Sequence, residues 1–336
     1  MSGATPSPRW YALTAAAVVL PLALAGCGSS SKGTSTTPSS GTSAAAKGCT
    51  PKAGTQLVVL ADDKHSQNSD NIVPVVKTSL AKAPLTDALN AVSKALSQDA
   101  LNSLNSDVGV SGKTDAQAAA AFISKYNVGS GLSGGSGNIV IGTQSFAEAS
   151  TLGEVYKEVL TKAGYTASVK KIGLRNLLEP ALESGEVQVV PEYAASLTQF
   201  LLDKDKNTSQ SASTEIDKTM AVLKPLALKH GFTALDPAAA TDENAYAVTK
   251  ATSVAYGLKT MSDVVSKCGT TGITFGAAAN CPSNPFCAAT LKKVYGITIS
   301  FKSLDADGPL SRAAVKQGKV LIGEVFSSDP DLVQAS

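Results

Sequence analysis

The chain has 336 residues, of which 43% are hydrophobic and 17% charged, and its mean hydropathy is +0.07. These values predict a folded body with a large core, and they exclude a disordered tail or a protein with many membrane spans. The net charge is only +2 and comes without a block of like charges, so nucleic acid is not an expected partner. The two histidines, His65 and His230, lack cysteines or carboxylates at metal-ligand spacing, so we expect neither a metal site nor a Ser-His-Asp triad.

The first 27 residues resemble a bacterial export signal. Arg9 precedes an apolar run over residues 10–25, which is too short for a stable membrane span and ends in small residues. The run leads into Leu24-Ala25-Gly26-Cys27, which resembles the lipobox of bacterial lipoproteins, in which the cysteine thiol receives a diacylglyceryl group. We therefore expect residues 1–26 to be a cleaved signal peptide and Cys27 to be lipidated. An ordinary signal peptide with an incidental cysteine is the alternative.

Residues 27–55 are expected to form a flexible tether. Small residues and proline dominate this stretch up to residue 48, and they cannot compensate for the entropy lost on ordering. A lipid on Cys27 and such a spacer would hold a folded module at the outer face of the bacterial cell membrane. Contact with the membrane would then be made through the anchor only.

The remaining four cysteines fit an oxidising, extracytoplasmic location. They are Cys49, Cys268, Cys281 and Cys287, an even number that favours two disulfides over a catalytic thiol. Three pairings are possible and the sequence does not choose among them. Cys281 and Cys287 flank a proline-containing loop that a disulfide would brace.

The first folded stretch begins with strands and continues with helices. Apolar, β-branched runs predict strands over 56–61 and 72–76. Helical spacing of apolar residues predicts helices over 83–96, 98–104 and 114–126, with Ser97 and Thr114 as N-caps. A glycine-rich segment over 129–137 interrupts all periodicity and is predicted to be a flexible connector.

Strands and helices alternate after this connector. The strands are expected at 139–142, 166–172, 187–190, 246–249, 273–275, 298–302 and 320–326. The helices are expected at 147–163, 175–184, 213–230, 260–267, 288–295 and 309–317. This rhythm is typical of parallel α/β sheets. Two such units joined by extended segments near 71–76 and 245–249 would leave a ligand cleft between them.

Four stretches of this second part carry distinctive motifs. They read IVIGTQSFAEASTLGEVYKEVLTKAGY from residue 139, GLRNLLEPALESGEVQVVPEYAASLTQFL from 173, LDPAAATDENAYAVTKATSVAYGLKTMSDV from 235 and LKKVYGITISFKSLDADGPLSRAAVKQGKVLIGEVFSSD from 291. Together they resemble the substrate-binding proteins of ABC importers for quaternary-amine osmoprotectants, the glycine betaine/choline/carnitine family. The resemblance implies an α/β type II periplasmic-binding-protein fold, in which two lobes joined by two hinge strands close around a solute. It also implies a monomer without a cofactor and without enzymatic activity.

The order of the segments departs from that family. The stretch LVVLADDKHSQNSDNIVPVVKTSLAKAPLTDALNAVSKALSQDALNSLNSDV, which starts at residue 57, resembles the C-terminal part of family members but comes first here. We therefore predict a circular permutation, in which 56–128 corresponds to the family C-terminus, 129–137 is a Gly/Ser linker and 138–336 is the remainder. Two tandem domains are the alternative. Permutation makes both lobes discontinuous, with about 71–128 plus 138–245 in lobe 1 and about 56–70 plus 246–330 in lobe 2.

The resemblance also suggests which residues hold the ligand. A trimethylammonium group has no hydrogen to donate, so proteins surround it with aromatic rings that give about 0.5–2 kcal/mol each. Tyr193 and Tyr246 match cage-type tyrosines, and Gln144, Ser145 and Phe146 match the loop that lines the cleft. Ordinary packing at the domain boundary is the alternative for both tyrosines.

Several positions depart from the family pattern. Asp70 and Asn71 stand where relatives often carry an aromatic residue, and Asn284 stands where they often carry an arginine. Asp70 is therefore a candidate to neutralise a cation directly, and the missing arginine weakens the case for a ligand with a carboxylate. Phe326 is a candidate apolar wall, with core packing as its alternative.

The expected function is that of an extracytoplasmic, lipid-anchored receptor. It would capture a quaternary amine such as glycine betaine, choline or carnitine and deliver it to the transmembrane subunits of an ABC permease. A receptor for an unrelated small polar or cationic solute is one alternative. An exported enzyme using the same cleft is another, but the sequence offers no nucleophile and base for it.

Overall fold

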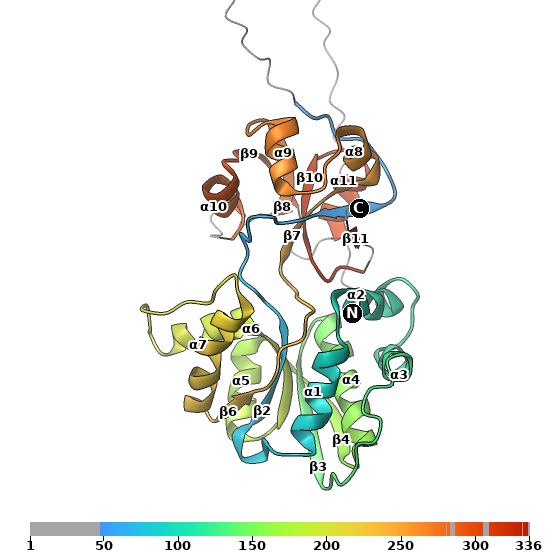
Figure 1. Ribbon diagram of the computed structural model, residues 1–336, viewed down its shortest axis with the longest axis vertical. Helices are drawn as coiled ribbons and strands as arrows, with labels where there is room; N and C mark the ends of the chain where they lie inside the picture. Colours follow the sequence, from blue (N-terminus) through green and yellow to red (C-terminus); the bar gives the residue numbers. More distant parts are fainter. Residues whose placement is uncertain (1–47, 280, 283–285, 305–308, 331, 335–336) are drawn as a thin grey trace, which may run out of the picture. The chain divides into compact units, whose positions relative to one another are not determined.

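The computed structural model describes residues 48–279, 281–282, 286–304, 309–330 and 332–334 (Figure 1). The predicted signal peptide, Cys27, most of the predicted tether and Asn284 lie outside these residues. The described chain forms two β-sheets with helices packed on them. None of its helices is both long and apolar enough to cross a membrane.

The first sheet has five strands in the order β4-β3-β5-β2-β6. They are β4 (Thr166–Gly173), β3 (Asn138–Gln144), β5 (Val189–Tyr193), β2 (Ile72–Lys77) and β6 (Phe232–Ala234). Strand β3 is parallel to both of its neighbours, whereas β2 is antiparallel to β5 and β6. The carboxyl ends of β3 and β5 therefore lie at the same edge, where α/β proteins usually bind ligands.

Seven helices cover the two faces of this sheet. One core cluster includes α1 (Leu85–Ala95), α2 (Gln98–Gly109), α3 (Asp115–Lys125) and α4 (Ala147–Lys162), and the other includes α5 (Arg175–Ser184), α6 (Ala194–Lys204) and α7 (Ile216–Lys229). Strand β2 contributes side chains to both core clusters, since Ile72 and Val76 belong to the first cluster and Val73 and Val75 to the second. This alternation is the two-residue period of a strand buried on both faces.

The second sheet has six strands in the order β11-β1-β7-β10-β8-β9. They are β11 (Leu332–Gln334), β1 (Leu57–Leu60), β7 (Asn244–Thr249), β10 (Ile322–Phe326), β8 (Ile273–Ala278) and β9 (Ile299–Leu304). The helical elements are α8 (Lys250–Tyr256), α9 (Met261–Cys268), α10 (Ala288–Thr290), the π-helical turn η2 (Leu291–Tyr295) and α11 (Pro309–Lys316). Helix α9 and η2 share a core cluster on one face, and α11 packs in a cluster on the other.

The chain crosses between the sheets in two segments, residues 61–71 and 235–243. They lie side by side (Figure 1), because the Asp242 backbone N–H donates to the Asp70 carbonyl at 3.1 Å and the Asn71 amide donates to the Ala238 carbonyl at 2.8 Å. A further contact joins α2 to the residues after β10, where Asn105 Nδ2 donates to the Ser328 carbonyl at 2.8 Å.

Most predicted elements are confirmed within a few residues, and Ser97 and Thr114 do cap their helices. Helices α6 and α8 and the short strands β6 and β11 were not predicted. Helix α6 follows β5 without a turn, because Tyr193 is both the last strand residue and the N-cap, so the sequence shows no boundary there.

The glycine-rich segment passes closely over the end of α4. The Gly135 N–H donates to the Ala163 carbonyl at 2.8 Å, and the Thr166 N–H donates to the Gly137 carbonyl at 2.9 Å. A Cβ at position 135 would lie 2.7 Å from the Ala163 oxygen, which explains why glycine stands there.

Two disulfides resolve the pairing that the sequence left open, Cys49–Cys268 and Cys281–Cys287. The first connects the segment before β1 to the end of α9 over a sequence separation of 219 residues. Because a long closed loop restricts the unfolded chain most, we expect the C49A/C268A variant to lose roughly 3–5 kcal/mol of unfolding free energy. Urea unfolding followed by circular dichroism would measure the loss, and an unchanged midpoint would contradict the prediction.

Candidate functional site

A cleft lies where the crossing segments meet the two sheets. It contains a cavity of about 570 Å³ and an adjoining one of about 560 Å³, which share Phe146, Asp242 and Phe326 as common walls. Residues from both sheets line the first cavity, including Tyr193 at the end of β5 and Phe326 at the end of β10. This arrangement forms a site between two lobes, built largely from strand ends.

Aromatic rings form part of the cleft wall. Phe146 and Tyr193 come from the first lobe, and their ring centroids lie 5.9 Å apart. Phe286 and Phe326 come from the second lobe and line the same cavity, and Phe200 on α6 completes the set. Exposed ring faces on both lobes are the chemistry that holds a weakly hydrated organic cation.

Carboxylates outnumber cationic groups around this cleft. Asp70, Asp203, Asp242 and Glu243 line the first cavity, and Arg175 is the one cationic residue among the described residues that line it. The Arg175 guanidinium donates to both carboxylate oxygens of Glu192 at 2.9–3.1 Å, so an internal partner already balances its charge. The electrostatics of the cleft therefore favour a ligand with a net positive charge.

Asp70 is fixed by the beginning of α6. Its Oδ1 accepts a hydrogen bond from the Ser196 N–H at 2.9 Å and its Oδ2 accepts one from Ser196 Oγ at 2.5 Å. Burial raises the pKa of Asp70, and the hydrogen bonds from Ser196 and the positive charge of Arg175 oppose that shift. Asp70 thus points an oriented carboxyl group at the first cavity.

Two consecutive acidic residues of the second crossing segment also face the cavity. Burial, together with the nearby charge of Glu148, holds the pKa of Asp242 well above its usual range. Burial raises the pKa of Glu243 to about 7. The charge of Glu243 therefore changes within the physiological pH range.

Tyr193 is held by a buried hydrogen-bond relay. Its hydroxyl donates to Glu148 Oε1 at 2.7 Å, and Glu148 Oε2 accepts from Asn105 Nδ2 at 2.6 Å. Asn105 also bonds the Ser328 carbonyl after β10, so the relay joins the Tyr193 ring to the contact between the lobes. Only 4% of Tyr193 is exposed, which fixes its ring at the cavity wall.

The structure brings most of the predicted residues to the cleft. Gln144, Phe146, Tyr193, Asp70 and Phe326 line the first cavity, and Ser145 lines the second. Gln144 is 5% exposed, and its Nε2 has no hydrogen-bond partner among the described residues. A buried amide N–H without a partner is a donor available to a ligand oxygen.

Two predicted residues lie elsewhere. The Asn71 side chain bonds the Ala238 carbonyl and lines neither cavity, so it joins the crossing segments. Tyr246 is fully buried in the core of the second lobe, where its hydroxyl accepts a hydrogen bond from Gln67 Nε2 at 2.8 Å, and it also lines neither cavity. The Tyr246 hydroxyl is thus linked to the cleft through Gln67, which lines the first cavity.

Several lining residues escaped the sequence analysis, among them Gln67, Arg175, Asp242, Glu243 and Phe286. Asp242 and Glu243 stand in the stretch TDENAY, shortly before Tyr246, which was predicted to contact the ligand. Two adjacent acidic residues directly before a buried strand were the sequence signal that could have predicted acidic side chains in the cleft. Phe286 carried none, because its neighbours at the cleft, among them Gln67, are distant in the sequence.

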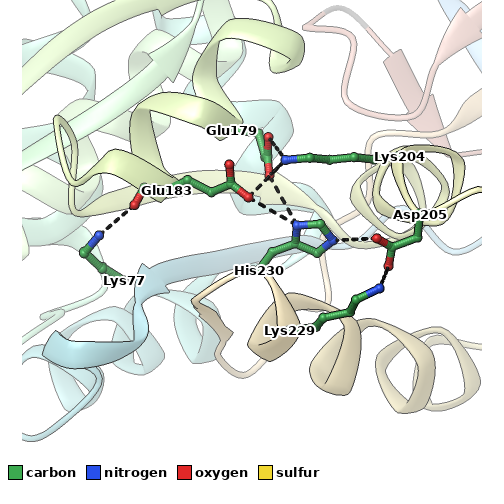
Figure 2. A network of polar contacts seen from close by, with 7 residues as sticks. All are labelled: Lys77, Glu179, Glu183, Lys204, Asp205, Lys229 and His230. Atoms are coloured by element: carbon green, nitrogen blue, oxygen red, sulfur yellow. Dashed lines mark hydrogen bonds and ion pairs between the residues drawn. The ribbon is translucent and has the colours of Figure 1, made fainter.

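A separate polar cluster lies on the first lobe, where α5, α6 and α7 end (Figure 2). Ligand atoms of Glu179, Glu183 and His230 lie within 4.8 Å of one another, a grouping that could hold a metal ion. However, the Lys204 ammonium already contacts both glutamates, at 2.7 and 2.8 Å to Glu179 and at 3.0 Å to Glu183. This cluster is therefore an internal ion-pair network, in which lysine supplies the positive charge.

Cys281, Cys287 and Glu324 form a second close group of metal-ligand atoms. Both sulfurs are engaged in a disulfide, which removes the thiolates that a metal would need.

Of the comparisons with known proteins, the one with family models matches most of the chain. A family model described as the substrate binding domain of the ABC-type glycine betaine transport system matches residues 45–125 and 137–335. The comparison with curated proteins gave no match.

Among solved structures, three distant matches each share 12% sequence identity with the chain. Clavulanic acid biosynthesis oligopeptide binding protein 2 matches over 53% of this chain and 42% of its own, with a TM-score of 0.26. A putative peptide binding protein AppA from Clostridium difficile matches over 59% and 48%, with a TM-score of 0.29. A substrate binding protein from Microbacterium hydrocarbonoxydans, complexed with 4-hydroxybenzoate hydrazide, matches over 55% and 45%, with a TM-score of 0.25. The chain thus spans less than half the length of each of these three.

Proposed function

We propose, since the chain belongs to the family of substrate-binding domains of ABC-type glycine betaine transport systems, that it captures a choline-like quaternary-ammonium cation in the interlobe cleft. It would then deliver this cation to the transmembrane subunits of its permease. Proteins of this family bind a solute for transport and carry out no reaction on it. The observation that carries the choice of ligand is the charge of the cleft: in the part of the chain that the structure describes, Arg175 is the one lining cation, and it is already paired with Glu192.

The two ends of the ligand have different needs. The trimethylammonium group would lie against the rings of Tyr193, Phe146 and Phe326, with the carboxylates supplying the opposite charge. The hydroxyl of choline needs a single donor, which the unpartnered Gln144 amide provides. The carboxylate of glycine betaine would instead face Asp70 and Glu243, and the described lining residues offer it no free cation, so we expect it to bind more weakly.

Calorimetric titration with choline, glycine betaine, carnitine and proline tests this proposal. We expect a micromolar Kd for choline, which corresponds to about −8 kcal/mol, and an affinity for glycine betaine at least tenfold lower. Tighter binding of glycine betaine would contradict the choice of cation. If none of the four compounds binds, the alternative of a receptor for an unrelated solute would be favoured.

The affinity for choline should depend on pH through Glu243. Because the pKa of Glu243 is about 7, this carboxyl is mostly ionised at pH 8 and mostly protonated at pH 6, where it no longer attracts a cation. We expect the affinity to fall roughly two- to tenfold from pH 8 to pH 6, as measured by calorimetry. In the Glu243→Gln variant this part of the pH dependence should disappear; a variant with the wild-type pH profile would show that another group is responsible.

We also propose the finer organisation that the sequence suggested. Cys27 would carry the lipid, the tether would hold the module at the membrane surface, and the type II fold would be circularly permuted. The family match supports the permutation, because it falls into two pieces that flank the glycine-rich segment, where the joint would lie.

Metabolic labelling with a fatty acid tests the lipid anchor. We expect the protein to become labelled and the Cys27→Ala variant to remain unlabelled.

A further inference from the structure

We propose that the Cys281–Cys287 disulfide is a positioning element of the ligand site, because it holds Phe286 at the wall of the cleft. The inference rests on the proposed function, since it concerns the affinity for the same cation. It gives the two disulfides of the chain different roles, one in stability and one in binding.

The disulfide fixes Phe286 from the core side. Both sulfur-bearing residues are fully buried in the core cluster of the second lobe, next to residues such as Phe275. The Cys281 N–H donates to the Ala278 carbonyl at the end of β8 at 2.9 Å, and the Leu291 N–H donates to the Cys287 carbonyl at 3.0 Å. Phe286 directly precedes Cys287 in the chain. The buried disulfide therefore fixes the position of the backbone from which the Phe286 side chain extends.

Gln67 fixes Phe286 from the cleft side. Its Nε2 donates to the Phe286 carbonyl at 3.1 Å and to the Tyr246 hydroxyl at 2.8 Å, which uses both hydrogens of the amide. Gln67 is only 6% exposed and lies on the first crossing segment. The Phe286 backbone is therefore held between the buried disulfide and the crossing segment.

The position of Phe286 matters because its ring contributes to the cavity. It is 38% exposed and lines the first cavity together with Tyr193 and Asp70. An aromatic ring that remains partly open beside carboxylates is suited to contact an organic cation. The affinity that the Phe286 ring adds depends on preorganisation. If the ring had to be ordered when the ligand binds, the entropy cost of ordering it would offset part of the binding free energy.

The sequence separations of the two disulfides support this division of roles. Cys281 and Cys287 are 6 residues apart, whereas Cys49 and Cys268 are 219 apart. A short closed loop restricts the unfolded chain much less than a long one, so the short disulfide contributes less to global stability. Loss of the Cys281–Cys287 disulfide should therefore change the affinity for the ligand more than the free energy of unfolding.

Choline titrations of a matched set of variants test the proposal. We expect C281A/C287A and Phe286→Leu each to lower the affinity for choline about tenfold, and C49A/C268A to leave it unchanged. If the disulfide acts through Phe286, adding Phe286→Leu to C281A/C287A should lower the affinity no further. Full additivity, or wild-type affinity in a folded C281A/C287A variant, would overturn the proposal.

A second measurement covers the case in which C281A/C287A does not fold. The C49A/C268A variant can be treated with a phosphine reductant, which opens Cys281–Cys287 without removing any side-chain atoms. The affinity for choline should then fall about tenfold while circular dichroism shows a folded protein, and an unchanged affinity of the reduced protein would overturn the inference. Failure of the unmodified protein to bind either choline or glycine betaine would instead count against the proposed function.

Discussion

Replacing Asp70 with asparagine should lower the affinity for choline about 10- to 100-fold. Asparagine retains the size of the side chain, its Oδ1 can still accept the hydrogen bond from the Ser196 N–H, and the Ser196 hydroxyl can turn to accept one from its Nδ2, so the change mainly removes charge. A charge within about 4 Å of a cation contributes up to about 4 kcal/mol at the effective dielectric of a protein surface, and each tenfold change in affinity corresponds to about 1.4 kcal/mol. Calorimetry on the wild-type protein and the variant measures the loss.

Two controls make this prediction specific. Asp236→Asn removes the same charge from an exposed loop position after β6 and should change the affinity for choline less than twofold. Glycine betaine carries no net charge, so Asp70→Asn should weaken its binding less than that of choline and reduce the preference between the two. Equal effects of Asp70→Asn and Asp236→Asn would show that Asp70 does not face the cation.

The sequence predicts the α/β architecture well because the relevant signals are local. Ser97 and Thr114 accept hydrogen bonds from the first turns of α2 and α3, and such caps can be recognised within four residues. The buried strands are short apolar runs, and the segments between them carry helical periodicity. These features require no knowledge of distant contacts.

The aromatic part of the site was only partly predictable, and β7 shows why. Its sequence, NAYAVT, is nearly continuous in small or apolar residues, so no alternation reveals which face each residue takes. In the structure Tyr246 and Val248 enter one core cluster, and Ala245 and Ala247 enter the other. A shift of one residue in register would have turned Tyr246 to the opposite face. Phe286 takes a place at the cavity only because a disulfide and Gln67 hold it.

The acidity of the cleft was hidden for a different reason. The net charge of the whole chain is +2, and its carboxylates are spread along the sequence. Asp70, Asp203 and Asp242 come from two crossing segments and the end of α6, which meet only in the folded protein. Long-range topology, rather than composition, creates the negative cleft.

Replacing Lys204 with methionine should lower the free energy of unfolding by about 2–4 kcal/mol. Glu179 is only 3% exposed in its side chain and depends on the Lys204 ammonium, which contacts both of its oxygens at 2.7 and 2.8 Å (Figure 2). Removing one partner of a fully buried ion pair costs about 3–5 kcal/mol. After the loss of Lys204, His230 Nδ1 remains 3.8 Å from Glu179 Oε1. The expected loss is smaller here, because Lys204 itself reaches solvent and water screens the pair. Urea unfolding followed by circular dichroism measures it.

Two further variants test whether the loss of stability in Lys204→Met comes from the buried Glu179 carboxylate or simply from the loss of a positive charge. Lys218→Met removes the same charge from an exposed pair with Glu215 and should change stability by less than about 0.5 kcal/mol. Adding Glu179→Gln to Lys204→Met removes the stranded carboxylate and should restore part of the stability. Lys204 ends the helix whose first turn carries Ser196, the partner of Asp70, so choline affinity should change little as long as the helix stays folded. Equal losses from Lys204→Met and Lys218→Met would mean that the network in Figure 2 contributes no more to stability than an exposed ion pair.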